Sequence, residues 1–360
     1  MAFDPREPFD DLPPIPPAAD IETKAILRLA VSASRALAEL KGLGGIVPDQ
    51  AILIHSIPLQ EAKASSEIEN IVTTNDALYK AVDSASALTD PPTKEVLRYR
   101  SALWQGYERV KVAPLSLDLI RSLCSALRDT PVDFRAEGQN VRIGNRTTGR
   151  ISYSPPRGGP TLLVKLENLL DYLNRDTGHD PLVRMAVGHY QFEAIHPFDD
   201  GNGRTGRMLN ILYLVERGLL DIPVLYLSGF IMKDKAKYYG SLRAVTEAGE
   251  WEAWLEYMLE GVEQTALWTR GRIVTIKALL DSTIDRCRSD LPKVYSKELI
   301  ELIFRKPYCR IADLVDAGIA KRQTASEYLQ ELERAGILAG EKAGREQVYR
   351  NVALLRALAE

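Results

Sequence analysis

Cysteine is scarce in this sequence. Only three cysteines occur in 360 residues, Cys124, Cys287 and Cys309, and they lie far apart. Such spacing provides neither a disulfide framework nor a cluster of thiolates that binds a metal. It fits a reducing compartment, and we therefore expect a cytoplasmic protein.

Long hydrophobic runs are also missing. No apolar stretch has the length that crosses a bilayer, and the first residues are acidic and rich in proline, as in 10–17, instead of basic and then apolar. We therefore expect no membrane-spanning segment, no membrane partner and no export by a signal peptide. Residues 1–20 are predicted to form an extended arm that packs on helices or is partly disordered.

An excess of charge of either sign is absent as well. Lysine and arginine total 46 and aspartate and glutamate total 49, which gives a net charge of −3. This balance argues against a protein that coats nucleic acid or binds membrane surfaces through its overall charge. Apolar residues, by contrast, make up 45% of the chain, enough for substantial cores that we expect in two domains.

Helical patterns dominate from about residue 21 to residue 285. Apolar residues recur there at helical spacing, for example Ile26, Leu29 and Ala30. Four prolines are expected at helix starts or in loops: Pro92, Pro114, Pro131 and Pro181. The sequence therefore predicts a mainly α fold.

The most informative stretch is 196–207, which reads His-Pro-Phe-Asp-Asp-Gly-Asn-Gly-Arg-Thr-Gly-Arg. Gly201, Gly203 and Gly206 let the backbone pass close to an anion, and the apolar run 208–214 predicts a helix directly afterwards. A phosphate therefore fits at the helix N-terminus, where unpaired N–H groups and the helix dipole favour negative charge.

The polar side chains of this stretch suit polyphosphate chemistry. Arg204 and Arg207 lie three residues apart, so they share a helix face and can hold neighbouring phosphates. Asp200 is the expected anchor for Mg²⁺, which typically takes one or two carboxylates plus substrate phosphates. His196 has the ordinary pKa best suited to taking a proton from a hydroxyl at neutral pH. The stretch is neither a Walker A loop nor a dinucleotide-binding fingerprint.

This stretch matches every specified position of the Fic family signature, His-x-Phe-x-Asp/Glu-Gly-Asn-Gly-Arg-x-x-Arg, and the chain resembles that family. The resemblance implies a mostly helical domain that transfers AMP from ATP to a Tyr, Thr or Ser hydroxyl of a protein. The histidine separates the chain from the branch that has lost the base. Gly203 separates it from the toxin-like kinase branch, which carries lysine there.

The resemblance also implies roles for individual residues. His196 is the base, Asp200 holds Mg²⁺, and Phe198 is a buried anchor. The residues implied to bind the phosphates of ATP are Gly201, Asn202, Gly203, Arg204, Thr205, Gly206 and Arg207.

A second motif lies upstream, in a segment that is predicted to be helical over about 59–70. Ser65, Glu69 and Asn70 form Ser-x-x-x-Glu-Asn, which resembles the inhibitory helix motif of one class of Fic proteins. The resemblance implies that Glu69 pairs with Arg207 and so enters the ATP site. A charge-assisted hydrogen bond of about 1.5–3 kcal/mol corresponds to roughly ten- to hundredfold suppression. The alternative is that these residues form a solvated helix face.

Residues 142–156 interrupt the helical pattern. They combine β-forming residues with Gly and Asn turns and predict a β-hairpin. The hairpin resembles the flap with which Fic enzymes pair with an extended target segment, which implies target contacts at Ile151, Ser152 and Tyr153. The alternative is an ordinary surface hairpin. Further on, Tyr239, or less favourably Tyr238, matches a tyrosine that the family supplies to the nucleotide pocket.

The pattern changes again after Pro292. A short helix at 311–315, a turn at Gly318, a second helix at 321–332 and a β wing follow, and together they resemble a winged helix-turn-helix. This keeps open DNA binding through a recognition helix that starts at Lys321, Arg322, Gln323 and Thr324. Because 291–360 holds 12 Lys/Arg and 10 Asp/Glu, a net of +2, a protein-binding or dimerising domain is an equal alternative.

The motifs occur in the order found in two-domain bacterial Fic adenylyltransferases. The expected domains are an arm (1–20), an N-terminal helical region (21–110), a Fic catalytic core (111–285) and a winged helix domain (291–360). We expect an autoinhibited protein adenylyltransferase that uses ATP and Mg²⁺ on a target protein, or on itself. Homodimer exchange, metal identity or a partner remain open as the means of relieving Glu69. The alternatives are removal of AMP at the same site, with Glu69 positioning a water, and a DNA-binding regulator.

Overall fold

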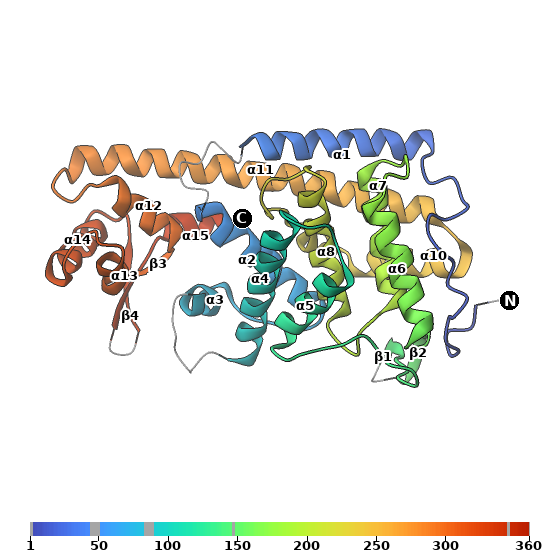
Figure 1. Cartoon of the computed structure of the whole chain (residues 1–360). Coiled ribbons are helices and arrows are strands. Elements are labelled where there is room, and N and C mark those ends of the chain that lie inside the picture. The colour runs from blue at the N-terminus through green and yellow to red at the C-terminus, as the bar shows by residue number, and fades with distance from the viewer. Residues whose placement is uncertain (1–2, 44–50, 83–89, 146–147, 344–345, 360) are drawn as a thin grey trace.

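The computed structural model describes residues 3–43, 51–82, 90–145, 148–343 and 346–359, which form a mainly helical protein, as predicted (Figure 1). Within these residues no helix is both long enough and apolar enough to cross a bilayer. The helices before the C-terminal region are α1 (Lys24–Leu43), α2 (Ala51–Ile68), α3 (Asn75–Val82), α4 (Pro91–Val110), α5 (Leu117–Arg128), α6 (Pro160–Asn174), α7 (Pro181–Ile195), α8 (Asn202–Glu216), α9 (Leu227–Lys233), α10 (Lys235–Ala248) and α11 (Trp251–Asp290).

Helix α11 runs along the whole molecule, and α1 lies parallel to it (Figure 1). An apolar stripe on α1, with Ile26, Ala30 and Leu37 buried, packs against α11. Polar contacts border the stripe, such as the hydrogen bond of 2.6 Å from Ser32 Oγ to Glu263 Oε1. Helix α11 thus leads from the helical body to the C-terminal region without a break.

Helices α7 and α8 form the centre of the protein. Almost every residue of α7 is buried, and so is every residue of α8 from Arg204 to Leu214. Asp180 caps α7 by accepting a hydrogen bond of 2.8 Å from the N–H of Leu182, and Pro181 occupies the first turn as predicted. Because neither helix has a solvent face, the loop that joins them is held by the core on both sides.

The predicted β-hairpin is present. Strands β1 (Ile143–Asn145) and β2 (Arg150–Tyr153) pair antiparallel. The N-terminal arm lies close to this hairpin (Figure 1). It packs on the helices, which is the first of the two alternatives predicted for it, the other being partial disorder. Leu12 and Ile15 of the arm are buried in the core.

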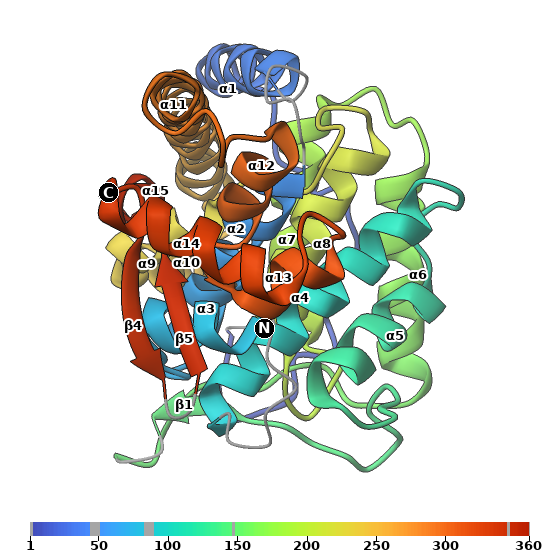
Figure 2. The ribbon, with the colours of Figure 1, turned by 90° about the vertical axis from the view of Figure 1, so that its left-hand side faces the viewer.

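The C-terminal region has the helix–strand–helix–helix–hairpin order of a winged helix (Figure 2). Its elements are α12 (Lys297–Arg305), β3 (Tyr308–Arg310), α13 (Ile311–Asp316), α14 (Arg322–Arg334), β4 (Ala339–Ala343), β5 (Glu346–Arg350) and α15 (Val352–Ala359). The strands form one antiparallel sheet in the order β3-β5-β4. Gly318 has a φ of 69°, which suits the predicted turn between α13 and α14. Elements α12, β3 and α15 were not predicted.

This C-terminal region packs on the segment that follows α2. The ring of Tyr308 in β3 stacks on Tyr79 of α3 at 6.1 Å and 10°. The Tyr308 hydroxyl donates a hydrogen bond of 2.5 Å to Asp76 Oδ1, and Lys80 Nζ lies 3.0 Å from Glu341 Oε1. Helix α12 also contacts α2. The region is therefore fixed to the helical body by both apolar and polar contacts.

Candidate active site

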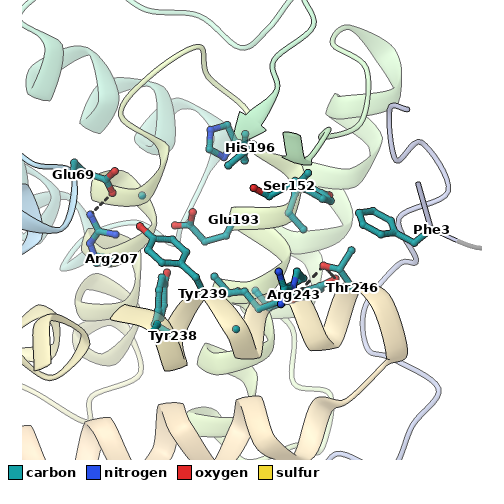
Figure 3. Close-up of a pocket in the computed structure, with 18 residues that line it drawn as sticks. Phe3, Glu69, Ser152, Glu193, His196, Arg207, Tyr238, Tyr239, Arg243 and Thr246 are labelled. Carbon is teal, nitrogen blue, oxygen red and sulfur yellow. Dashed lines mark hydrogen bonds and ion pairs between the residues drawn. The ribbon is translucent and has the colours of Figure 1, made fainter. Parts of the chain in front are cut away.

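A cavity of 440 Å³ lies where the α7–α8 loop meets the end of α2, the β1–β2 hairpin and the start of α10 (Figure 3). A volume of this size falls within the range of small-ligand sites. The structure brings seven of the residues predicted for the site to this cavity: Glu69, Ser152, Tyr153, His196, Gly203, Arg207 and Tyr239.

The loop from α7 to α8 has a fixed conformation. His196 ends α7 with a φ of 51°, and Gly201 precedes α8 with a φ of 87°. The side chain of Asn202 accepts a hydrogen bond of 2.8 Å from the N–H of Phe198 and donates one of 2.9 Å to its carbonyl. Phe198 is fully buried, as expected of an anchor. A left-handed histidine is a costly conformation that the surrounding contacts maintain.

Several predicted phosphate ligands do not line the cavity. The amide of Asn202 is engaged with the loop itself, and Thr205 is fully buried. Gly206 faces α7, where an added Cβ would lie 2.6 Å from Glu193 Oε1. A contact of these residues with phosphate therefore stays a prediction, and it would have to involve their backbone.

His196 carries no charge at neutral pH. Burial, followed by the positive charge of Arg135, lowers the pKa of His196 to about 4. The imidazole is therefore neutral at pH 7, although its ordinary pKa is near 6.5. A neutral ring in a cavity with space for a hydroxyl has the form that a general base requires.

Arg135 holds the backbone of this histidine, and the sequence did not reveal it. Arg135 Nε donates a hydrogen bond of 2.9 Å to the carbonyl of His196, and Nη2 donates to the carbonyls of Ile195 (3.1 Å) and Pro156 (2.8 Å). The arginine is almost completely buried. A single arginine in a loop carries no local motif, so this function arises only from the tertiary contacts.

Arg207 is bound by the end of α2. Its Nε donates a hydrogen bond of 2.8 Å to Ser65 Oγ, and its Nη2 donates to the Ser65 carbonyl (2.9 Å) and to Glu69 Oε1 (2.7 Å). Figure 3 shows the Glu69 contact at the edge of the cavity. The alternative of a solvated helix face is wrong for Ser65, which is fully buried. Asn70 has a φ of 63° and follows the end of α2, where it is exposed.

Lys235 fixes the same end of α2, and sequence reasoning missed it. Its ammonium group donates hydrogen bonds to the carbonyls of Glu67 (3.0 Å) and Ile68 (3.2 Å). These carbonyls belong to the last turn of the helix, where a positive charge is favourable. Lys235 therefore helps to hold Glu69, the next residue, against Arg207.

Two further predicted residues are paired with groups outside the signature. Arg204 has a side chain that is 3% exposed, and its Nη1 lies 2.8 Å from Glu95 Oε2 on α4. Asp200 Oδ1 accepts a hydrogen bond of 2.8 Å from the N–H of Gly201, and its Oδ2 lies 2.9 Å from Arg128 Nη1. Neither Glu95 nor Arg128 was found from the sequence.

Asp200 has the properties of a single carboxylate ligand for Mg²⁺. Across the residues that the structure describes, no three His, Cys, Asp or Glu side chains gather into a metal site. Mg²⁺ nevertheless commonly takes only one or two carboxylates and obtains its other ligands from phosphates and water. Asp200 is such a single carboxylate, and one of its oxygens is oriented by the loop backbone.

Glu193 is a second carboxyl group in the cavity that the sequence did not identify. It lies one helical turn before His196 and between His196 and Arg207 in Figure 3. Burial raises the pKa of Glu193 to about 7, although the charge of Arg207 acts in the opposite direction. This group therefore titrates close to neutral pH, beside the guanidinium that Glu69 occupies.

The two tyrosines at the start of α10 have different environments. Tyr238 is 1% exposed, and its hydroxyl lies 2.8 Å from His189 Nε2 in the core. Tyr239 is 49% exposed and borders the cavity. Tyr238 borders the same cavity, but the more exposed Tyr239 offers more of its ring for stacking on a base, and that role stays a prediction.

The hairpin contributes Ser152 and Tyr153 to the cavity wall, whereas Ile151 lies outside it. The Tyr153 hydroxyl donates a hydrogen bond of 2.8 Å to the carbonyl of Ala194, two residues before His196. The hairpin is thus attached directly to the helix that carries the histidine.

Comparison with protein families assigns three segments of the chain. Residues 27–108 match the family described as Fic/DOC family N-terminal, and residues 114–214 match the Fic/DOC family. Residues 279–354 match the C-terminal domain described as protein adenylyltransferase SoFic-like.

Similar curated proteins carry related names. A probable protein adenylyltransferase of Aquifex aeolicus is 29% identical over 192 residues, which is 52% of this chain and 55% of that protein. The protein adenylyltransferase fic-1 of Caenorhabditis briggsae is 34% identical over 106 residues, 28% of this chain and 19% of that protein. The chain thus spans 55% or less of the length of these two relatives.

Solved structures share the fold. A Fic family protein from Desulfovibrio desulfuricans aligns with a TM-score of 0.58 and 20% identity, over 91% of this chain and 96% of that one. A Fic domain containing signaling protein from Bacteroides thetaiotaomicron aligns with a TM-score of 0.55 and 19% identity, over 69% of this chain and 98% of that one. At these identities the likeness concerns the fold alone.

Proposed function

This chain is built from Fic/DOC family domains, and on that premise we propose that it is a protein adenylyltransferase. It would transfer AMP from ATP to a Tyr, Thr or Ser hydroxyl of a target protein, or of another copy of itself. The observation that carries the proposal is a neutral, half-buried His196 in a cavity that also contains Arg207 and the N-terminus of α8. The names of the curated relatives support the same activity.

The chemistry follows from the order of groups along the cavity. His196 accepts the proton of the acceptor hydroxyl, whose oxygen attacks the α-phosphorus of ATP. A new oxygen–phosphorus bond forms to AMP, the bond to the β-phosphate breaks, and pyrophosphate leaves. The N-terminus of α8, with Gly203 in its first turn, and Arg207 stabilise the negative charge that develops on the phosphates. Tyr239 is the proposed contact for the base.

Asp200 is the proposed ligand for Mg²⁺. Its Oδ2 would exchange Arg128 for the metal, while Oδ1 stays on the Gly201 N–H. When bound, the ion supplies positive charge that offsets the charge of the triphosphate. Arg204 would have to leave Glu95 if it is to reach a phosphate, because the two side chains form an ion pair at 2.8 Å.

We further propose that Glu69 inhibits the transfer. Its carboxylate uses an Arg207 donor that the outer phosphates need, and it repels a triphosphate bound in the same cavity. Ser65 also holds the guanidinium, through Nε and through the same Nη2 that Glu69 contacts. ATP would therefore bind in a position that does not allow in-line attack, until α2 moves or Glu69 turns away.

Incorporation of α-³²P-labelled ATP tests base and inhibition together. The full-length proteins are wild type, Glu69→Gly, Glu69→Gly with His196→Ala, and the matched control Glu67→Gly, each alone and with a cell lysate. We expect label mainly with Glu69→Gly, and loss of about 10²–10⁴-fold in the double variant. Glu67 faces Lys63 and not Arg207, so Glu67→Gly should resemble wild type.

Other outcomes would reject the proposal. Label within a few-fold of Glu69→Gly in the double variant would remove His196 from the role of base. Equal activation by Glu67→Gly would mean that loosening α2, and not the Glu69 carboxylate, controls the site. Absence of label in every variant, together with release of AMP from a labelled protein by wild type, would favour AMP removal instead.

The C-terminal region supports a second candidate function, binding of DNA. Lys321, Arg322 and Gln323 are exposed at the start of α14, the position of a recognition helix in this topology. We expect salt-dependent retention of the full chain on duplex DNA, and its loss in Lys321→Glu with Arg322→Glu. Equal retention of both proteins at low salt would exclude this helix as the contact. The domain limits 1–20, 21–110, 111–285 and 291–360 also remain our proposal.

A further inference from the structure

The N-terminal arm makes direct backbone contact with the end of the hairpin. The N–H of Phe9 donates a hydrogen bond of 3.0 Å to the carbonyl of Ser154, which directly follows β2. The Ser154 hydroxyl in turn donates a hydrogen bond of 2.7 Å to the carbonyl of Pro5. The arm and the hairpin therefore hold each other over several residues.

An aromatic cluster extends this contact to the cavity. Phe3 stacks on Tyr153 with 6.0 Å between ring centroids and 21° between planes, and Phe9 meets Tyr153 edge-on at 6.3 Å and 79°. Phe3 and Phe9 also meet edge-on, at 5.4 Å. Phe3 itself borders the cavity, on the side of Ser152 (Figure 3).

The arm is anchored independently of the hairpin. Asn168 of α6 both donates a hydrogen bond to the carbonyl of Ile15 and accepts one from its N–H, each of 2.9 Å. Gln191 of α7 donates a hydrogen bond of 3.0 Å to the carbonyl of Pro13. The arm thus connects the hairpin to the two helices behind it, one of which ends at His196.

The hairpin has little support of its own. Its strands contain three and four residues, and an isolated two-stranded hairpin is marginally stable in water. Tyr153 is attached to α7 by its hydroxyl and to the arm by its ring. Removal of the arm contacts would leave the Tyr153 hydroxyl as the main polar link between the hairpin and the helix of His196.

We propose that Phe3 and Phe9 are positioning residues for the acceptor. They hold Tyr153 and thereby set the distance between the hairpin and His196, which decides whether the hydroxyl of an extended acceptor segment reaches the imidazole. The inference rests on the proposed function and on the expectation, implied by the family resemblance, that the hairpin pairs with the acceptor. Phe9 is not among the residues that line the cavity, so nucleotide binding should not depend on it, whereas Phe3 borders the cavity itself and is used only in the exchange measurement.

The test uses the full chain in the Glu69→Gly background, with Phe3→Ala, Phe9→Ala, the conservative Phe9→Tyr, and Glu7→Ala as a control at an exposed arm residue. Hydrogen exchange of the amides of 150–153 reports the hairpin directly. We expect exchange at least about tenfold faster in the alanine variants, and near the parent rate in Phe9→Tyr and Glu7→Ala.

Activity gives the second measurement. With labelled ATP and lysate protein as the acceptor, Phe9→Ala should need about tenfold more lysate protein for half-maximal labelling, while its half-saturating ATP concentration stays unchanged. Unchanged hairpin exchange, or a parallel rise in both half-saturating concentrations, would overturn the proposal. If Glu69→Gly labels nothing, the proposed function fails, and the exchange rates still decide whether the arm positions the hairpin.

Discussion

Glu69 reaches Arg207 across the position at which Gly203 lacks a side chain. The carboxylate accepts a hydrogen bond of 2.7 Å from Arg207 Nη2, and a Cβ at residue 203 would lie 2.3 Å from Glu69 Oε1. Without a Cβ at residue 203, a phosphate has room to approach the helix N-terminus, and the same room admits the Glu69 carboxylate. Phosphate and carboxylate would compete for the same guanidinium in the same space.

Lys235→Met should weaken the proposed inhibition without touching the cavity. The ammonium group caps the last turn of α2, and such a charge is worth about 0.3–1 kcal/mol, which corresponds to roughly two- to fivefold. We expect labelling by the otherwise wild-type protein to rise by that factor. Lys233→Met is the control, because Lys233 is exposed on the preceding helix. No rise, or an equal rise with Lys233→Met, would contradict the role of Lys235.

Arg135→Lys should impair positioning of the base. Lysine keeps the charge but cannot reach the carbonyls of His196, Ile195 and Pro156 together, as the planar guanidinium does. In the Glu69→Gly background we expect kcat to fall about ten- to hundredfold, with the affinity for ATP unchanged. Calorimetry and steady-state labelling would measure the two quantities. A weaker affinity with unchanged kcat would show that Arg135 acts on the nucleotide instead.

The pH dependence of transfer should lack a histidine limb near pH 6.5. Burial lowers the pKa of His196 to about 4, so the imidazole loses its proton well below neutral pH and is already the base at pH 6. We expect labelling by Glu69→Gly at saturating ATP to show no loss from protonation of His196 between pH 8 and 6. A tenfold fall per pH unit below 6.5 that persists after Glu193→Gln would mean that the histidine is accessible and not desolvated.

Glu193→Gln should change how stability varies with pH. The folded pKa of Glu193, about 7, lies above its ordinary value of 4.5, so its favourable contribution is present below pH 4.5 and is lost as pH rises through 7. A neutral glutamine avoids that loss, which amounts to at most about 3 kcal/mol. We expect the variant to gain thermal stability relative to wild type at pH 8 and not at pH 4.5. The exposed Glu256→Gln should show the same difference at both values.

Local sequence patterns predicted much of the architecture. The predicted helix starts near Pro92 and Pro181, the hairpin within 142–156 and the wing after Gly336 are present, because each depends on residues that are neighbours in the chain. Helix α2 extends further toward the N-terminus than the predicted 59–70, since Ile52, Leu53 and Ile57 bury an apolar face that no motif marked.

The cavity was predicted only in part. His196, Gly203 and Arg207 lie within one short loop and helix, so their mutual arrangement follows from helix geometry and spacing. Arg204 and Asn202 belong to the same stretch, yet Arg204 pairs with Glu95 and Asn202 braces Phe198. Spacing identifies a residue as available to a site, but it does not reveal which neighbour will take its hydrogen bonds.

Helix periods, turn residues and the spacing of the signature are encoded within a dozen consecutive residues, and those features could be derived before any coordinates were known. The supports of the site connect residues that are 61 positions apart for Arg135 and His196, 138 for Glu69 and Arg207, and 168 for Lys235 and Glu67. These pairs exist only in the packed tertiary structure. The burial that lowers the pKa of His196 and raises that of Glu193 likewise exists only in the packed protein, because desolvation is a property of the whole surrounding core.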